Sequence, residues 1–229
     1  MKEESIYTRT EMVFGEGGVS NLRGCHVAVF GVGGVGGFAV EALVRAGVGR
    51  LTLVDSDTVA PSNLNRQIIA ARSTLGKYKT EAAKDRILDI NPDCRVEALN
   101  IFYGEDTEGQ IDLRRFDYII DAIDSVRSKL LLIRRATECG VRIISSMGAG
   151  NKLDPTRFRG TDISKTHTDP LAKVLRTELR RVGINHLPVV FSDEPPHNPT
   201  KSRTPGSVSF VPSVVGLILA GEVIKDLVK

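Results

Sequence analysis

Long hydrophobic runs are missing from this sequence of 229 residues. The longest candidate, residues 211–227, is interrupted by one proline and three charged residues (Pro212, Glu222, Lys225 and Asp226). A membrane-spanning helix needs about 20 consecutive apolar residues. The first five residues, Met-Lys-Glu-Glu-Ser, also lack the apolar stretch of a secretory signal. We therefore expect a cytoplasmic protein with no membrane span.

Cysteine is equally scarce. The three cysteines, Cys25, Cys94 and Cys139, lie far apart and form no Cys-x-x-Cys pair. This pattern excludes a disulfide framework and a tetrahedral zinc site of cysteines. We expect Cys139 to be a buried small hydrophobic side chain on a helix near 125–140, and not an activated thiolate.

A large excess of positive or negative charge is absent as well. The chain has 31 Lys and Arg against 28 Asp and Glu, which gives a net charge of +3. This mildly basic balance permits an RNA partner without requiring one. The hydrophobic share of 41% is ample for a core, and the length suits one large domain or two small ones.

Apolar strand-like runs alternate with helical periods through the first 147 residues. This alternation predicts an α/β fold, a Rossmann-like, doubly wound and mainly parallel sheet. We expect strands near 26–31, 50–55, 95–101, 116–121 and 141–146, and helices near 34–47, 77–90 and 125–140.

The segment 148–206 has a different composition, rich in Gly, Pro, His and charged residues. We expect one helix in it, near 169–182, and a loop from 192 to 207. An apolar run resumes at 208–210, and Pro212 suits the first turn of a final helix that ends near 228. We predict a single domain, 1–229, in which 148–206 is a crossover insertion that binds substrate and C-terminal strands extend the sheet.

A glycine-rich turn, Gly31-Val-Gly-Gly-Val-Gly-Gly37, lies between the first predicted strand and helix. Glycines let the backbone turn tightly and approach a diphosphate at the helix N-terminus. Asp55 ends the next strand, at about the spacing expected for a ribose-binding acid. The turn alone fits NAD, FAD and ATP sites alike, and also a tight turn without a ligand.

Charged residues after the turn favour ATP. Cleavage of a triphosphate needs positive charge at the phosphates and a carboxylate for magnesium. Arg66 and Lys79 supply the first and Asp124 the second, because Asp124 follows the carboxyl end of the 116–121 strand, where ligands bind in open α/β sheets. Taken singly, Arg66 is also compatible with a surface cation, Lys79 with a solvated helix residue and Asp124 with a helix N-cap.

With these residues in this order, the chain resembles the adenylating superfamily of ubiquitin-activating-type enzymes, which includes molybdopterin-synthase and thiamine-pathway adenylyltransferases. The resemblance covers roughly residues 7–150 and includes Tyr7-Thr-Arg-Thr. It implies that Arg9 reaches the ATP of the neighbouring protomer in a homodimer. It also implies a carboxylate attack on the α-phosphate of ATP. The resemblance further implies that Asp55 holds the ribose hydroxyls, that Asn63, Arg66 and Lys79 hold the phosphates, and that Asp124 holds magnesium. The full set of expected nucleotide-binding residues is Gly31, Gly33, Gly34, Gly36, Asp55, Asp57, Asn63, Arg66, Gln67 and Lys79.

Residues 148–206 indicate the branch of the superfamily. They contain no cysteine, whereas some activators of sulfur-carrier proteins place a nucleophilic cysteine there. Motifs such as Thr161-Asp-Ile-Ser-Lys-Thr166, Val189-Val-Phe-Ser192 and Gly206-Ser-Val-Ser-Phe-Val211 resemble the tRNA threonylcarbamoyladenosine dehydratases. That resemblance implies adenylation of the threonyl carboxylate of a modified tRNA adenosine, followed by ring closure and release of AMP.

The predicted helix 169–182 is compatible with an RNA substrate. Apolar residues form one stripe, and Lys173, Arg176 and Arg180 form a basic flank that we expect to contact RNA phosphates. A solvated basic face is the alternative. The stripe comprises Leu171, Val174, Leu175, Leu179 and Val182.

The leading hypothesis is therefore an ATP-dependent tRNA threonylcarbamoyladenosine dehydratase, with a sulfur-transfer protein as a candidate partner. Two rivals stay open. One is an adenylyltransferase that activates the C-terminal Gly-Gly of a ubiquitin-like sulfur carrier. The other is a nucleotide-binding regulatory module without turnover, against which the set Arg66, Lys79 and Asp124 argues.

Overall fold

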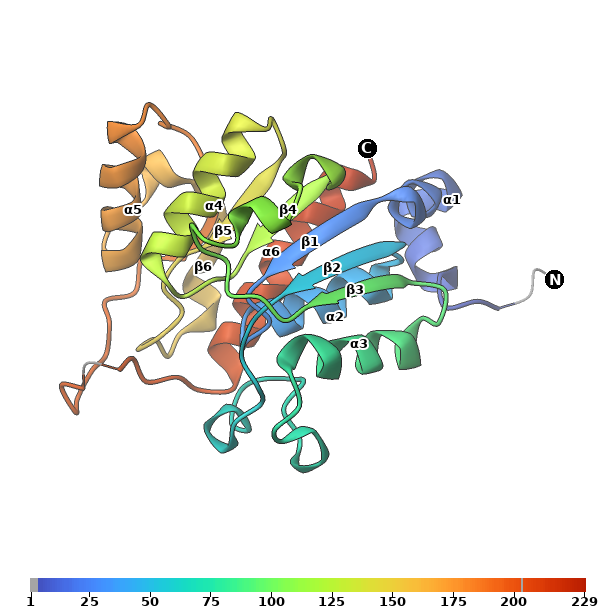
Figure 1. The fold of residues 1–229 in the computed structure, drawn as a ribbon, viewed down its shortest axis with the longest axis horizontal. Coiled ribbons are helices and arrows are strands. Elements are labelled where there is room, and N and C mark those ends of the chain that lie inside the picture. The colour runs from blue at the N-terminus through green and yellow to red at the C-terminus, as the bar shows by residue number, and fades with distance from the viewer. Residues whose placement is uncertain (1–3, 203) are drawn as a thin grey trace.

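A seven-stranded sheet with helices on both faces forms the protein (Figure 1). The computed structural model describes residues 4–202 and 204–229. The strand order is β3-β2-β1-β4-β5-β7-β6, and all neighbours are parallel except β6 and β7. The strands are β1 His26–Phe30, β2 Arg50–Val54, β3 Arg95–Leu99, β4 Tyr118–Asp121, β5 Ile143–Ser146, β6 Phe158–Asp162 and β7 Pro188–Ser192. The helices are α1 Thr8–Gly24, α2 Gly36–Ala46, α3 Lys79–Ile90, α4 Val126–Glu138, α5 Pro170–Arg181 and α6 Phe210–Leu227.

The central strands are buried on both faces, as parallel strands flanked by helices usually are. One hydrophobic core lies between the sheet and α1, α2, α3 and α6, and a second lies between the sheet and α4 and α5. Alternate strand residues serve the two cores: Val27 and Val29 belong to the first, Ala28 and Phe30 to the second. The predicted α/β fold with a doubly wound, mainly parallel sheet is thereby confirmed.

The segment 148–206 contributes two strands, β6 and β7, to the same sheet. β7 pairs with β5 in parallel, and β6 pairs antiparallel with β7 at the sheet edge. The extension of the sheet was expected, but its strands come from within the crossover segment and not from the apolar run 208–210. That run is no strand, because Ser209 is the N-cap of α6 and the helix begins at Phe210.

Helix α6 fixes the position of the glycine turn. Gly216 lies so close to α2 that a Cβ there would be 2.2 Å from the Val35 carbonyl oxygen. Pro212, which falls in the first turn of α6 as predicted, packs against Gly34. The final helix thus holds the start of α2 and the turn before it as one packed unit.

Two expectations about side-chain burial are wrong. Cys139 is exposed, because it caps α4 at the point where the chain leaves the helix. On α5 the buried stripe is narrower than predicted and consists of Ala172, Leu175 and Leu179. Val174 and Val182 are 45% and 55% exposed, because they flank the side of α5 that packs on the sheet.

Candidate active site

The glycine turn connects β1 to α2 at the carboxyl edge of the sheet. Gly31 has φ +85°, and a Cβ there would lie 2.5 Å from the Ala122 carbonyl oxygen. Only glycine therefore permits this close approach of the turn to the β4–α4 connection. Helix α2 begins without a side-chain cap and without an acidic residue in its first turn. The positive end of the helix dipole favours an anion at this point, and of the first amides those of Gly37 and Ala39 already donate to the Gly33 and Val35 carbonyls.

Asp55 lies directly after β2 and joins that strand to the glycine turn. Its Oδ2 accepts a hydrogen bond from the Val32 amide at 2.7 Å, and its Oδ1 accepts one from the Asp57 amide at 2.9 Å. Burial raises the pKa of the Asp55 carboxyl, while the nearby charge of Lys79 and the two amide hydrogen bonds oppose the rise. The side chain is thus held at the turn.

Lys79 is the first residue of α3 and is buried, so the solvated alternative is wrong for this residue. Its Nζ lies 2.6 Å from Asp57 Oδ2 and 3.8 Å from Asp55 Oδ1. A buried ammonium group is costly unless it is paired, and these two carboxylates supply the pairing. The structure therefore brings Lys79, Asp55 and Asp57 together.

The pentapeptide Asn63-Leu-Asn-Arg-Gln67 lies in the connection between β2 and α3. Asn63 is buried and closes a turn, with its Oδ1 accepting from the Ala60 amide at 3.0 Å. Arg66 is half-buried and lies against the turn, since a Cβ on Gly34 would be 3.4 Å from Arg66 Cγ. Its Nη1 donates to the Ser62 carbonyl at 2.9 Å.

Gln67 provides a test of whether this site fits a polar ligand. The side chain is 6% exposed, and among the described residues its Oε1 is the buried side-chain atom that lacks a hydrogen-bond partner. Its Nε2 lies beside Gly33, 3.7 Å from where a Cβ would be. A buried amide oxygen without a partner costs stability unless a ligand or water satisfies it. A nucleotide over the turn fits this requirement.

Asp124 lies in the connection between β4 and α4, the segment that packs against Gly31. It is exposed and does not cap α4, because Ser125 is the N-cap and its Oγ accepts from the Ser128 amide at 3.4 Å. The N-cap alternative for Asp124 is therefore wrong. In the described part of the chain no group of three or more His, Cys, Asp or Glu side chains is arranged to hold a metal. Asp124 would have to share a magnesium ion with phosphate oxygens.

A fully buried ion pair beside the site escaped the sequence analysis. Lys129 Nζ lies 2.8 Å from Asp121 Oδ2 and 3.1 Å from Ser145 Oγ, and the side chains of the ion pair are 0% exposed. Ser145 Oγ donates to Asp121 Oδ2 at 2.6 Å, and the Ile123 amide donates to Asp121 Oδ1. The pair ties β4, β5 and α4 together beneath the Asp124 connection. The only sequence signal was a lysine among apolar neighbours on a helix.

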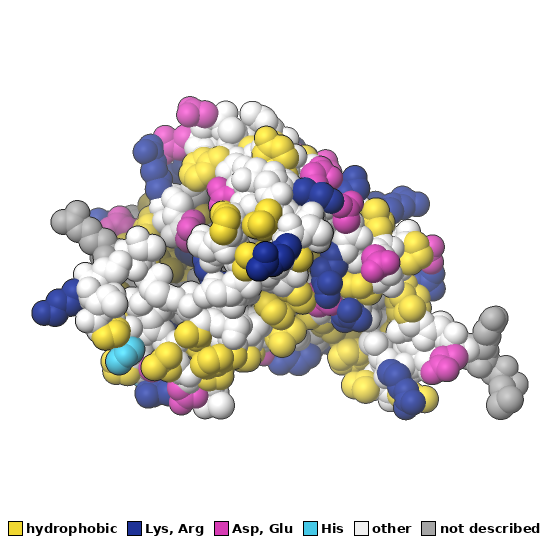
Figure 2. Space-filling model, turned by 90° about the horizontal axis from the view of Figure 1, so that it is seen from below, with side chains coloured by type: hydrophobic (Ala, Val, Ile, Leu, Met, Phe, Trp, Pro, Cys, Tyr) yellow, Lys and Arg dark blue, Asp and Glu magenta, His cyan; other side chains and the backbone are white. Residues whose placement is uncertain are grey.

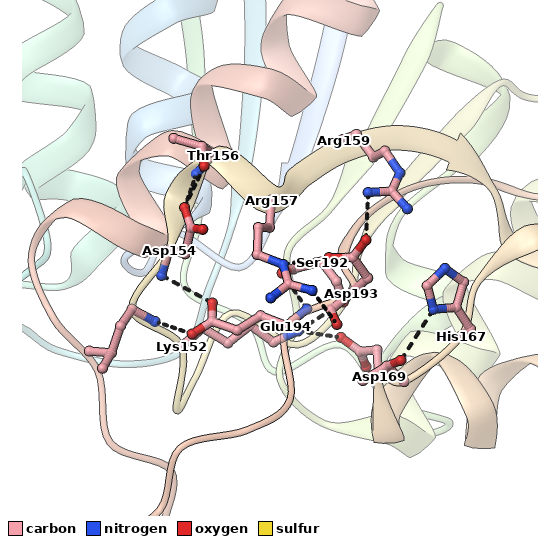
Figure 3. A network of polar contacts seen from close by, with 12 residues as sticks. Lys152, Asp154, Thr156, Arg157, Arg159, His167, Asp169, Ser192, Asp193 and Glu194 are labelled. Atoms are coloured by element: carbon pink, nitrogen blue, oxygen red, sulfur yellow. Dashed lines mark hydrogen bonds and ion pairs between the residues drawn. The ribbon is translucent and has the colours of Figure 1, made fainter.

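A second polar network anchors the crossover segment (Figure 3). Lys152 Nζ donates to Asp169 Oδ2 at 3.3 Å and to the Ser192 carbonyl at 3.1 Å, and both charged side chains are buried. Asp169 also caps α5 through the Ala172 amide and accepts from the Gly148 amide at 3.1 Å. The network fixes α5 against the end of β5, on the same edge of the sheet as the glycine turn.

Glu194 and Asp193 extend this network at the end of β7. Glu194 accepts from the amides of Leu153 and Asp154, while Asp193 pairs with Arg157 at 2.6 Å and Arg159 at 3.0 Å. These contacts are visible in Figure 3. They hold the entry and the exit of the crossover segment side by side.

The basic flank of α5 is divided in the structure. Lys173 and Arg180 are exposed. Arg176 is half-buried, and its Nη1 donates to the Thr166 carbonyl at 2.9 Å and to Thr166 Oγ1 at 2.6 Å. Arg176 therefore also has a structural role, because it fastens the loop before α5 to the helix.

Arg9 lies on α1, away from the glycine turn of its own chain. The residue two positions earlier, Tyr7, accepts a hydrogen bond from Asn91 Nδ2 at 3.1 Å, and Asn91 follows α3 at the amino edge of the sheet. Arg9 itself is exposed. A nucleotide at the carboxyl edge is therefore out of its reach within one chain.

The surface around the connection between β2 and α3 is seen in Figure 2, from below the view of Figure 1. Lys and Arg side chains are spread over this face between apolar and neutral areas, and no single basic block dominates it. No helix among residues 4–202 and 204–229 is long and apolar enough to cross a membrane.

These features define an α/β protein in which a glycine turn, the Asp55–Lys79 pair and Asp124 lie at the carboxyl edge of the sheet. The profile of the ThiF family matches residues 7–229, and the chain belongs to that family. It is 48% identical to a Bacillus subtilis tRNA threonylcarbamoyladenosine dehydratase, over 97% of this chain and 94% of the relative.

Solved structures agree with this sequence relationship. The crystal structure of the Escherichia coli tRNA N6-threonylcarbamoyladenosine dehydratase in complex with AMP superposes with a TM-score of 0.90. The two chains are 36% identical, and the match covers 96% of this chain and 92% of that one. The ATP complex of the same E. coli protein gives a TM-score of 0.88 at 35% identity. The resemblance to this branch of the superfamily is thereby confirmed.

Proposed function

We propose that this protein is an ATP-dependent tRNA threonylcarbamoyladenosine dehydratase. The observation that carries the proposal is the convergence of Asp55, Lys79, Arg66 and the β4–α4 connection on one glycine turn. The 48% identity to a relative of that name, over nearly the full length of both chains, supports it. The crystal structures with AMP and ATP of the E. coli relative support ATP as the nucleotide.

The reaction begins with the threonyl carboxylate of the modified adenosine. A carboxylate oxygen attacks the α-phosphate of ATP, and pyrophosphate leaves with the bonding electrons. An atom of the carbamoyl unit then attacks the activated carbonyl, the ring closes, and AMP leaves with the former carboxylate oxygen. The net change in the substrate is the loss of one water, and no enzyme nucleophile is needed.

The residues around the turn have distinct proposed roles. Asp55 accepts hydrogen bonds from the ribose hydroxyls, and the amides at the start of α2 face the phosphates. Asn63, Arg66, Gln67 and Lys79 lie along the phosphates, where Arg66 and Lys79 stabilise the charge that develops. Asp124 holds magnesium, which neutralises phosphate charge when it is bound.

The active form is proposed to be a homodimer in the cytoplasm. Arg9 is exposed at the amino edge of the sheet, so it serves a nucleotide only if a second copy brings it to the neighbouring carboxyl edge. Arg9→Ala should then lower activity, and mixing this variant with an Asp124→Ala variant should restore part of it in hybrid dimers. Equal loss without restoration would contradict a shared site.

The crossover segment 148–206 is proposed to hold the tRNA. Lys173 and Arg180 are free to contact phosphates, and Arg176 supports the helix that carries them. Lys201, in the loop before α6, is exposed and adds to this surface, while Arg203 lies outside the described residues. A sulfur-transfer protein is a further proposed partner.

The alternative function is activation of the C-terminal Gly-Gly of a ubiquitin-like sulfur carrier. It uses the same adenylation chemistry and predicts pyrophosphate exchange that depends on such a protein. Deletion of the gene followed by mass spectrometry of tRNA nucleosides tests the main proposal. Persistence of the cyclic nucleoside, in a strain without a second copy of the gene, would contradict it.

A further inference from the structure

Three arginines gather at the amino edge of the sheet, opposite the glycine turn. Arg50 begins β2, Arg95 begins β3, and Arg23 lies in the last turn of α1. They line a cavity of about 220 Å³ together with Tyr7, Gly49, Asn91 and Asp93. Since β2 rises about 3.3 Å per residue, this cavity is roughly 15 Å from the carboxyl edge of the same chain. It is therefore separate from that chain's nucleotide site.

The strand register forces two of these charges together. Arg50 and Arg95 are partners in the parallel ladder of β2 and β3, so their side chains leave the same face of adjacent strands. Like charges directly opposite each other are destabilising. Within the described residues none of the three arginines forms an ion pair, whereas Arg86 and Arg115 pair with Glu41 and Glu97.

The cavity also holds a prepared neutral donor. The Tyr7 hydroxyl accepts from Asn91 Nδ2, so its own proton is available to an incoming oxygen. The Tyr7 ring packs on Gly47, where a Cβ would lie 2.9 Å from Tyr7 Cε1. The Arg23 guanidinium lies over the same ring, 5.2 Å from its centroid. Contacts within the protein thus hold the side chains of Tyr7 and Arg23 in place.

The residues that line the cavity carry more positive than negative charge, which favours an anionic ligand. Three arginines and a single acidic residue, Asp93, are among the residues that line the cavity. Outside the cavity, burial lowers the pKa of His26 first, followed by the charge of Arg115, which does not line the cavity, and then by that of Arg50, which does. Guanidinium groups match phosphate oxygens in bidentate pairs. The cavity volume exceeds the roughly 30 Å³ of one water several-fold, so a tetrahedral oxyanion fits.

We propose that this arginine pocket binds a phosphate group. If the proposed function holds, the phosphate belongs to the backbone of the tRNA, at a point remote from the reacting adenosine of the same chain. A free phosphorylated small molecule is the other source of the same chemistry. Phosphate binding itself does not depend on the proposed function, and the two are tested separately.

The first measurement is a titration of the full-length protein with inorganic phosphate, followed by NMR of the arginine Nε–Hε groups. The signals of Arg23, Arg50 and Arg95 should shift saturably with phosphate and not with chloride at equal ionic strength. Removal of one charged hydrogen-bonding partner in Arg95→Gln should weaken phosphate binding about tenfold. No saturable shift, or an Arg23 shift that persists undiminished in the Arg50→Gln/Arg95→Gln variant, overturns the proposal.

The second measurement identifies the source of the phosphate. Binding of tRNA to the Arg50→Gln/Arg95→Gln variant is measured over a salt series, with Arg114→Gln/Arg134→Gln as the control of equal charge. The control arginines are exposed and pair locally with Asp112 and Glu138. A slope of log affinity against log salt that falls by about one in the arginine-pocket variant alone assigns the pocket to the RNA backbone. An unchanged slope, with phosphate binding lost, assigns it to a free phosphorylated ligand.

A failure of the proposed function gives a different result. In that case tRNA carrying threonylcarbamoyladenosine triggers no AMP release by the wild-type protein, whatever the pocket binds. Circular dichroism of each variant verifies the fold, and the single Arg23→Gln variant provides a second test on a different element. Because Arg23 is exposed at the end of α1, its replacement leaves both cores intact.

Discussion

Lys79 offers the most informative single perturbation of the proposed adenylation site. Its ammonium group is buried beside Asp57 and Asp55, at 2.6 and 3.8 Å, at the start of α3. The Lys79→Ala variant removes the positive charge that faces the proposed phosphates. Loss of one such group costs on the order of 2–4 kcal/mol of transition-state stabilisation. This corresponds to roughly a 30- to 900-fold loss in kcat/KM.

The same substitution has a consequence for pH dependence. Burial raises the pKa of Asp55, and the charge of Lys79 limits that rise. Without Lys79 the pKa of Asp55 should rise further. A ribose ligand needs the ionised carboxylate, so nucleotide affinity is lost as pH falls through this pKa. The acid limb of the affinity profile should therefore move to higher pH in Lys79→Ala.

The assay is AMP formation with modified tRNA, together with AMP affinity measured by calorimetry from pH 4.5 to 8. Lys77→Ala is the matched control, because Lys77 is exposed and, among the described residues, pairs with Asp85 alone, at 3.6 Å on the surface. Such surface pairs contribute little. A loss in kcat/KM below about threefold, or an acid limb identical to that of the wild type, would refute the assigned role of Lys79.

Three other predictions follow from individual side chains. Asp124→Ala should abolish magnesium-dependent turnover. Because Asp124 is exposed, the melting temperature should stay unchanged. Near-normal turnover in a folded variant would refute the proposed magnesium-binding role of Asp124. Cys139→Ser should retain full activity, and inactivation by this substitution would point to a cysteine relay. At pH 8 a thiol reagent should label the exposed Cys139 and spare Cys94, because burial raises the pKa of the Cys94 thiol to about 11. Lys129→Met should lower the free energy of unfolding in urea by about 3–5 kcal/mol, because Asp121 keeps a buried charge without its partner; a change below about 1 kcal/mol would contradict this.

The central strands β1, β2, β4 and β5 were predictable from the sequence, because they are largely buried and read as continuous apolar runs. Helix α1 was not predicted. It contains four glycines, bends at Gly15, and lacks the propensity of an isolated helix. Burial of Gly18, Val19 and Leu22 against the core provides the stability, and tertiary contacts of this kind leave little periodic signal.

The crossover segment 148–206 also contains structure that the sequence pattern does not reveal. Strand β6 carries two exposed residues, Arg159 and Gly160, because it lies at the sheet edge, and its pattern was not recognisable. The buried pairs Lys129–Asp121 and Lys152–Asp169 each join residues distant along the chain or in different elements. Composition favours an exposed position for such residues, so only the packed structure shows them to be internal.

The location of the candidate site residues was easier to predict than the contacts that they make. The glycine turn and Asp55 follow from local strand–turn–helix geometry, which short sequence motifs encode. That Lys79 pairs with Asp57, or that Asp55 accepts from the Val32 amide, depends on how β2 and α3 pack. The role proposed for Arg9 requires a second chain, and no pattern within one chain determines how two copies associate.

The most direct test of the central claim is the substrate dependence of AMP release. Purified protein with ATP and magnesium is mixed either with tRNA carrying threonylcarbamoyladenosine or with a small sulfur-carrier protein ending in Gly-Gly. The account predicts AMP release and the cyclic nucleoside with the tRNA, and no stimulation by the carrier protein. Pyrophosphate exchange that responds to the carrier protein and not to the modified tRNA would contradict it.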